Sequence, residues 1–422
     1  MRGLAVLLLV AGGVGDALAQ TPPNLLGAAT GAAGERIVGM RAETVGAVER
    51  FSLSLPVLNG LAGNVARQVR IALPGGQSVT CELRSQVRDG MTVLSGAPLG
   101  GDGRCDLVAA NGQVTGDLSV GSERYRIQPL GAGNAHAVVE FKTGEFPNER
   151  EPKQAVPGPD ERRGRLPGKD DEPCDVPPKA GESPRVFGPL RLLMLYTPAT
   201  RSDTPNIRAD VELIMQQFRR AYDAANIGGN FSVTVELAHA AEVNYTEGPN
   251  MDADLDRLTN PRDPVLRVAH ALRDTHKADL VHMLIKSKPN DGCGIGWLNM
   301  QLRAQDGFSI SDHQCAIGQF SAVHEIGHGL GMNHDRFVVE KNRPGPAEYN
   351  FGFVALEQGV RSIMAYRDMC DKARKPCPRQ LFLSSPNVRV KGAPFGAPID
   401  RPNAAYNVET LCRTAPAVAN FR

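Results

Sequence analysis

The chain has 422 residues, with 47 Lys and Arg against 46 Asp and Glu, eight Cys and 41% hydrophobic residues. The balance of charge excludes an overall electrostatic match to nucleic acid or to an acidic membrane surface. The hydrophobic content excludes wholesale disorder and a multi-span membrane protein, and the length indicates two or three domains of about 150 residues each.

The first 19 residues have the pattern of an export signal. Arg2 provides a positive start, residues 3–10 are apolar, and Ala17-Leu18-Ala19 forms a small-x-small cleavage site before Gln20. No later stretch approaches the ~20 apolar residues that a membrane-spanning helix needs. We therefore expect a secreted protein, extracellular or periplasmic, without a membrane anchor.

Because an exported protein folds in an oxidising compartment, we expect the eight cysteines to form disulfides, and their even number agrees with complete pairing. Sequence alone does not fix the connectivity, so several pairings stay open. Pairing of cysteines that lie near each other in sequence (local closure) favours Cys81–Cys105, Cys293–Cys315 and Cys370–Cys377. It leaves Cys174 and Cys412 as a fourth pair.

Residues 20–146 are expected to form a β-rich domain. The segment is rich in Val, Gly and Thr, and Asp89-Gly90 is a hairpin signal between two of its predicted strands. No cluster of His or Cys with metal-ligand spacing occurs in it. The predicted strands are 67–73, 78–83, 91–94, 124–127 and 137–141.

Residues 147–185 are rich in Pro and in charged side chains. This composition predicts an extended, solvated linker that is easily cut, and we expect neither helix nor strand in it.

The pattern changes to α/β over residues 186–422. Helical spacing of apolar residues is found at 211–225 and 265–275, and short strand patterns at 192–196, 231–237 and 280–285. This alternation predicts a mostly parallel sheet with covering helices.

The motif that indicates chemistry is His324-Glu325-Ile326-Gly327-His328. On a helix, residues i and i+4 lie on the same face, so the two imidazoles can converge on one ion. Glu325 lies beside them and is placed to act on a water bound to that ion. A short helix with a solvated His/Glu face is the alternative for these five residues alone.

The following residues extend the motif to H-E-x-x-H-x-x-G-x-x-H, with Gly331 and His334 as its last fixed positions. Gly331 can adopt a positive φ and turn the chain back, so that His334 reaches the same ion. Three neutral His favour one catalytic Zn²⁺ with an open position for water. The sequence does not reveal a calcium site.

The extended motif resembles that of the metzincin metallopeptidases, and Asp335 after the third His resembles the reprolysin/adamalysin branch. The resemblance implies a zincin-like catalytic domain with a twisted, mostly parallel sheet and an active-site helix, preceded here by the β-rich pro-domain. Met364 in Ser362-Ile363-Met364-Ala365-Tyr366 resembles the Met-turn beneath the zinc ligands. Tyr366 resembles a Tyr that stabilises the oxyanion or ligates the metal in astacins and serralysins; a buried structural Tyr is the alternative.

Residues from about 190 to the end also look like the bacterial peptidyl-Asp metalloendopeptidases. That family cuts on the amino side of Asp, which implies an Asp preference here, with broader specificity as the alternative. An acidic residue after the scissile bond needs a cation. Arg361 is the favoured candidate because it adjoins the Met-turn; Arg367, Lys372, Arg374, Lys375 and Arg379 follow it. The segments that carry this resemblance are 243–247, 254–258, 278–281, 293–298, Cys370 with Cys377-Pro378, and 418–422.

We expect a zinc-dependent endopeptidase that is made as a precursor. The enzyme is expected to be monomeric and to act on protein or peptide substrates. Hydrolysis would use a zinc-bound water with Glu325 as general base and then general acid, and Asp335 would orient neighbouring groups. A pro-segment would inhibit the enzyme, and Lys169-Asp170-Asp171 is a candidate processing site.

Cys174 has two interpretations: a cysteine switch on zinc, as in reprolysins, or the disulfide with Cys412. For the whole chain, a catalytically dead relative that binds a protein partner is the second hypothesis, and a structural zinc protein the third. The presence of all three His and of Glu325 favours an enzyme, and the open fourth ligand position disfavours a structural site.

Overall fold

A computed structural model describes residues 21–29, 40–63, 65–131, 133–154, 172–226, 229–340 and 348–422. The predicted export signal and the Lys169–Asp171 processing site lie outside these residues. Among the described residues, no helix has the length and apolar character needed to cross a bilayer.

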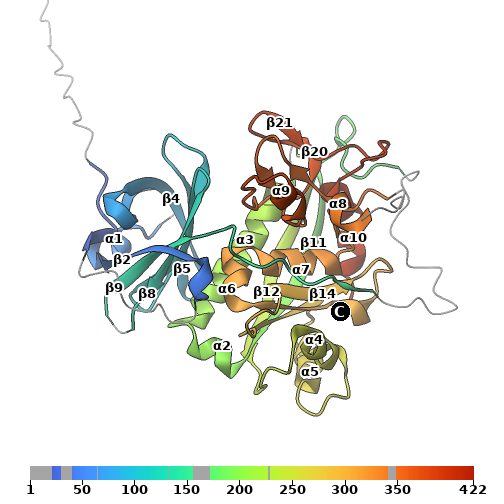
Figure 1. The fold of residues 1–422 in the computed structure, drawn as a ribbon, viewed down its shortest axis with the longest axis horizontal. Helices are drawn as coiled ribbons and strands as arrows, with labels where there is room; N and C mark the ends of the chain where they lie inside the picture. The colour runs from blue at the N-terminus through green and yellow to red at the C-terminus, as the bar shows by residue number, and fades with distance from the viewer. Residues whose placement is uncertain are drawn as a thin grey trace, which may run out of the picture.

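The N-terminal part is a nine-stranded antiparallel sheet, as the β-rich composition predicted (Figure 1). Asn24 forms a bridge to Arg70, so the first and last strands of this sheet approach each other. Asp89 and Gly90 both have positive φ and form the predicted hairpin turn. In the order β1-β2-β9-β8-β7-β6-β5-β4-β3, the strands are numbered along the chain as β1 (Leu26–Ala29), β2 (Val45–Leu53), β3 (Arg67–Ala72), β4 (Ser78–Arg88), β5 (Met91–Pro98), β6 (Gly103–Ala110), β7 (Gln113–Val120), β8 (Glu123–Pro129) and β9 (Ala135–Phe141), with helix α1 (Leu55–Gly60) after β2.

The second part is a six-stranded sheet covered by helices. All its strand pairs are parallel except β14 with β15, which confirms the mostly parallel sheet. The order is β10-β14-β15-β13-β11-β12, with bounds β10 (Lys153–Gln154), β11 (Arg185–Tyr196), β12 (Phe231–Glu242), β13 (Leu280–Ile285), β14 (Gly294–Leu298) and β15 (Phe308–Asp312). Its helices are α2 (Pro198–Ser202), α3 (Ile207–Asp223), α4 (Met251–Thr259), α5 (Arg267–Thr275), α6 (His313–Gly318), α7 (Ser321–Gly329), α8 (Arg336–Glu340), α9 (Asp368–Lys372) and α10 (Asn407–Val418).

Three small two-stranded sheets complete the C-terminal part. They pair β16 (Asn333–Asp335) with β17 (Phe351–Gly352), β18 (Val354–Ala355) with β19 (Val360–Arg361), and β20 (Ser385–Val390) with β21 (Ala393–Phe395). Three disulfides join the pairs expected from local closure, and the fourth joins the two remaining cysteines, Cys174 and Cys412. Because its sulfur is bonded to that of Cys412, Cys174 does not act as a cysteine switch in this structure, and that interpretation is corrected.

The linker was wrongly predicted to lack strands. β10 lies within it and pairs in parallel with β14 as the outermost strand of the six-stranded sheet. Figure 1 shows the segment before β10, in teal, crossing from the N-terminal sheet past α7 and along β14. The composition was misleading because a Pro-rich segment can still be ordered when a neighbouring strand edge supplies its backbone hydrogen bonds.

Helix α3 lies between the two parts of the molecule. Asn206 caps it by accepting a hydrogen bond from the Ala209 amide, 3.2 Å away. The apolar face packs under β12, as the helical spacing predicted, while polar residues face the N-terminal sheet. Among these, Gln217 donates to the buried Asp117 at 3.0 Å and Arg220 to Asp106 at 2.7 Å.

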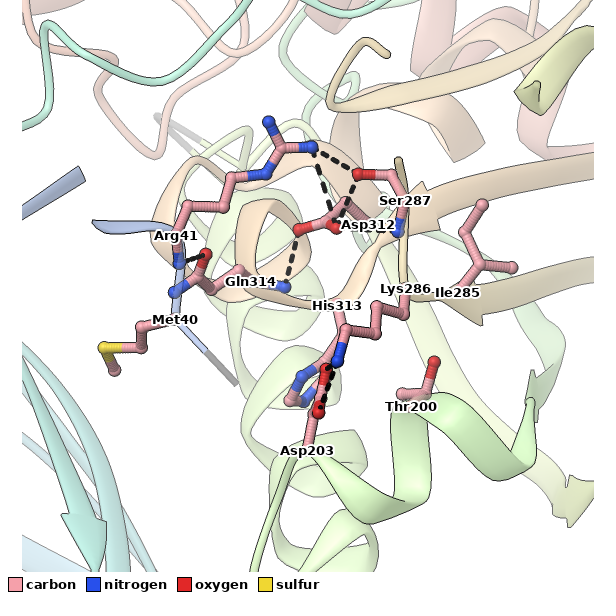
Figure 2. A pocket seen from close by; sticks show the side chains of 10 residues that line it. All are labelled: Met40, Arg41, Thr200, Asp203, Ile285, Lys286, Ser287, Asp312, His313 and Gln314. Atoms are coloured by element: carbon pink, nitrogen blue, oxygen red, sulfur yellow. Dashed lines mark hydrogen bonds and ion pairs between the residues drawn. The ribbon is translucent and has the colours of Figure 1, made fainter. Parts of the chain in front are cut away.

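A hollow of about 130 Å³ also lies at the contact between the N-terminal part and the second part. Figure 2 shows Arg41 of the N-terminal part directed at Ser287 and Asp312, with Gln314 accepting from the Arg41 amide. None of the three histidines of the zinc motif lines this hollow. The hollow is therefore part of the contact between the two parts of the molecule and lies apart from the zinc motif.

Asp210 on α3 is a buried acid of this contact with four side-chain partners. It is buried and pairs with Arg126 of β8 and with His313 Nε2 at 2.9 Å, and it accepts from Thr115 and Thr204. Burial opposes its ionisation, but the charge of Arg126 and these hydrogen bonds hold the pKa of Asp210 well below its ordinary value.

Asp210→Asn is expected to lower the free energy of unfolding of the full-length chain by about 3–5 kcal/mol at pH 7, because Arg126 stays buried without a counter-charge. A carboxyl group with a lowered pKa stabilises the fold above its unfolded pKa, and that contribution is lost as the pH falls below about 4. Urea unfolding should therefore show a difference between wild type and variant that shrinks at pH 3. The exposed Asp102→Asn is the control; a difference equally large at both pH values would contradict this account.

Candidate metal centre and active site

Helix α7 carries the H-E-x-x-H motif, as predicted. His324, Glu325 and His328 are all fully buried on it. The helix ends before Gly331, whose φ of +82° turns the chain back into β16, and β16 places His334 opposite the helix. The predicted role of Gly331 is thus confirmed.

The three imidazoles converge through their Nε2 atoms. His334 Nε2 lies 3.1 Å from His324 Nε2 and 3.0 Å from His328 Nε2. The Nδ1 atoms of His324 and His328 face the Ile363 carbonyl at 2.9 Å and the Met332 carbonyl at 2.7 Å. Donation from Nδ1 to a carbonyl fixes the tautomer and leaves the Nε2 lone pair for a metal.

This donor set fits zinc. Three neutral imidazoles are a ligand set of catalytic zinc sites. Burial lowers the pKa of His324 to about 3 and that of His328 well below its ordinary value, so both are neutral ligands at pH 7. Among the described residues, these three form a group of His, Cys, Asp or Glu whose ligand atoms all lie within 4.8 Å of one another.

Glu325 lies next to the converging nitrogens. Neither of its carboxylate oxygens has a hydrogen-bond partner among the described residues. Burial raises the pKa of Glu325 well above its ordinary value. A Cβ at position 294 on β14 would lie 2.5 Å from Glu325 Oε1, so Gly294 leaves the room that this carboxylate occupies. The arrangement holds a buried carboxylate ready to exchange a proton beside the metal ligands.

Met364 lies beneath the helix, fully buried. A Cβ at position 327 would come within 2.6 Å of the Met364 sulfur, so Gly327 of the motif allows the close packing of helix and turn. Asp335 accepts hydrogen bonds from the backbone amides of Tyr366, at 2.9 Å, and of Val338, at 3.4 Å. These contacts place Asp335 as a support of the turn that carries Tyr366.

The Tyr366 ring packs against His334, with 3.9 Å between the ring centroids. Its hydroxyl donates to the carbonyl of Glu149 at 2.6 Å and lies 3.0 Å from that of Arg150. Burial raises the pKa of Tyr366 well above its ordinary value, so the phenol keeps its proton. In this structure Tyr366 is therefore a hydrogen-bond donor to a peptide carbonyl in front of the metal ligands.

The residues before β10 cross the site. The Cys293 amide donates to the Asn148 carbonyl at 3.1 Å, and the Arg150 amide donates to the Gly294 carbonyl at 2.8 Å. Glu151 Oε2 lies 3.7 Å from His334 Nδ1. These bonds and those of β10 make residues 148–154 the outermost segment of the six-stranded sheet. This segment lies beside β14, whose Gly294 faces Glu325.

The predicted cation, Arg361, does not meet an acidic side chain directly. Its guanidinium donates to the carbonyls of Cys377, at 3.2 Å, and Ala365, at 2.6 Å, and burial lowers its pKa to about 9. In this structure Arg361 orders the loop backbone, and its assignment as the acid-binding cation stays a prediction.

Arg379, in contrast, binds a carboxylate directly. Its two terminal nitrogens bind the two carboxylate oxygens of Glu149 at 2.5 and 2.7 Å, and both side chains are fully buried. From sequence, Arg379 was only one of several cations after the Met-turn, and Glu149 was not singled out. Their separation of 230 residues gave no local signal that could have paired them.

Comparison with known proteins agrees with the geometry. Residues 209–335 match the model of the reprolysin-like metallopeptidases of family M12B. A protein from Stenotrophomonas maltophilia named peptidyl-Asp metalloendopeptidase is 27% identical over 356 residues, which cover 83% of this chain and 78% of that protein. Proteins of the same name from Xanthomonas campestris and Pseudomonas fragi are 27% and 26% identical, covering 75% and 46% of this chain and 69% and 95% of their own lengths. With its buried three-histidine site on the helix of the H-E-x-x-H motif, the chain is a metallopeptidase that is similar to the reprolysin-like M12B family over residues 209–335.

Proposed function

We propose that this metallopeptidase is a secreted zinc endopeptidase that prefers cleavage on the amino side of Asp and is made as a monomeric precursor inhibited by its own pro-segment. The observation that carries the catalytic part is the convergence of three Nε2 atoms beside the unpartnered carboxylate of Glu325. Four disulfides support an oxidising compartment outside the cytoplasm.

Zinc held by His324, His328 and His334 would supply Lewis-acid activation of water and polarise the scissile carbonyl. Glu325 takes a proton from the attacking water and later gives it to the leaving amine. Its raised pKa suits both tasks near neutral pH, because a carboxyl group with an ordinary pKa is a weak base and would hold the proton poorly.

Tyr366 donates a hydrogen bond to the carbonyl oxygen on which negative charge develops. Its contacts with the carbonyls of Glu149 and Arg150 support this role, since a substrate carbonyl in the same place would meet the same hydroxyl. A preorganised donor of this kind stabilises the oxyanion without reorganisation. Asp335 positions Tyr366 by binding its amide.

The pro-segment blocks the cleft because it already occupies the edge of β14. Its bonds to Cys293 and Gly294 use the backbone groups that an extended substrate would need. Support for the Asp preference comes from the names of the relatives and from the buried arginine next to the site. A cationic partner in a buried pocket selects for a carboxylate.

Digestion of an unfolded protein by the zinc-loaded, processed enzyme tests this function. We expect hydrolysis that a chelator abolishes and added zinc restores, with mass spectrometry placing most cuts before Asp. A heat-denatured enzyme sample is the control. Chelator-resistant cleavage would refute the zinc mechanism, and cuts distributed without regard to Asp would refute the preference alone.

A further inference from the structure

Glu149 fills a pocket that the catalytic part of the chain builds. Arg379 binds both of its carboxylate oxygens, and Ser321 Oγ donates to Oε1 at 2.7 Å. The Gln319 carbonyl, 3.0 Å from Arg379 Nη1, helps to hold the guanidinium in place. These partners come from the start of α7 and from the chain after the Met-turn, so the pocket does not depend on the N-terminal domain for its donors.

The charge of Arg379 needs a partner. A fully buried guanidinium without a counter-charge is strongly destabilising. Among the described residues, the ion pair of Arg379 is with Glu149. Burial opposes the ionisation of Glu149, but the charge of Arg379 holds the pKa of that carboxyl well below its ordinary value. When the pro-segment leaves, Arg379 therefore has lost its counter-charge, and its guanidinium is available to bind another carboxylate.

The pocket adjoins the reacting centre. The backbone carbonyl of Glu149 is bound by Tyr366, and the residues on either side of Glu149 bond to Cys293 and Gly294, opposite Glu325. A peptide that crosses the cleft along the same strand edge would thus place one of its side chains toward Arg379.

We propose that Arg379 is the specificity-determining residue for an acidic side chain of the substrate, and that Glu149 is the pro-segment's substitute for that side chain. The inference rests on the proposed function and names the site of its acid preference. Substrate carboxylate and Glu149 compete for one guanidinium, so the contact that inhibits the precursor is the contact that later selects the substrate. Cutting the linker after Gln154 would leave Glu149 in place, and activity requires that the segment also dissociates.

Full-length, zinc-loaded Glu149→Gln tests the inhibitory contact. Losing one charge of a buried, hydrogen-bonded pair should weaken the pro-segment's hold at least about 30-fold, so this unprocessed variant should hydrolyse unfolded protein at least about 10-fold faster than the unprocessed wild type. Glu145→Gln changes an exposed glutamate four residues earlier and should leave the rate as in wild type. If Glu149→Gln does not fold, Glu149→Asp keeps the charge on a shorter arm and should also raise the rate. An unchanged rate in the folded variant would overturn the proposal.

Cut sites test the pocket itself. Adding Arg379→Gln to Glu149→Gln leaves a neutral pair, which avoids a buried unpaired charge. Mass spectrometry should show cuts next to acidic residues for Glu149→Gln alone and for Glu149→Gln with the exposed Arg374→Gln, but not for Glu149→Gln with Arg379→Gln. The KM for an acidic peptide should rise at least about 30-fold relative to its amide analogue only in the Arg379 variant.

Different results would refute the acid pocket and the endopeptidase activity. Unchanged acid selection without Arg379, in an enzyme that still needs zinc, would overturn the pocket and leave the endopeptidase standing. Absence of any chelator-sensitive hydrolysis from all variants with zinc bound would overturn the proposed function and the inference with it.

Discussion

Glu325→Gln is expected to lower kcat for hydrolysis of an unfolded protein by about 10²- to 10⁴-fold, the range that a positioned general base contributes. The amide has the shape of the carboxylate but cannot take a proton from water. Both carboxylate oxygens are buried without partners among the described residues, so the fold loses no hydrogen bond in the exchange. The measurement is kcat of the processed enzyme alongside its zinc content, which should remain that of wild type.

The exposed Glu357→Gln is the matched control and should keep wild-type kcat. If Glu325→Gln raised only KM, Glu325 would bind substrate without exchanging protons. If it lost zinc, the carboxylate would be part of the metal's support. Either result would require a different base.

His334→Ala is expected to remove zinc and, with it, activity. Two imidazoles on α7 remain, but they leave the ion without its third protein ligand. Substitution of a residue that only hydrogen-bonds to a metal ligand already reduces metal affinity about 10- to 100-fold. Removal of the ligand itself should therefore reduce zinc affinity at least about 100-fold. Competition with a zinc-binding dye measures the affinity directly, and chain unfolding in urea checks that the fold survives.

His276→Ala serves as the control, since His276 stacks on His239 away from the three converging rings. Equal zinc affinity in wild type and His334→Ala would show that His334 is not a ligand. Activity without zinc in either variant would contradict the mechanism more broadly.

The metal site could be predicted from sequence because its geometry is local. Residues i and i+4 of a helix share a face, and a glycine at a fixed distance permits the turn that returns His334. Helix α3 and strand β12 were predicted for the same reason, since apolar residues follow a helical period over residues 211–225 and a strand period over residues 231–237. Residues 103–120 gave no comparable signal: no strand was predicted there, and they form β6 and β7.

The acid pocket could not be predicted, because its partners are remote in sequence. Glu149 lies in a Pro-rich segment whose composition indicated a solvated linker, and Arg379 is one of several cations in its stretch. Only the fold shows that Arg361 is already bonded to backbone carbonyls while Arg379 faces a carboxylate. The same holds for β10, whose bonds come from the edge of β14 and not from its own residues.

Anomalous diffraction at the zinc edge from crystals of the zinc-loaded protein would test the metal centre most directly. The account predicts one peak at about 2.0–2.1 Å from the Nε2 atoms of His324, His328 and His334 together. A peak bound elsewhere, or His334 turned away from an ion held by the other two, would contradict it.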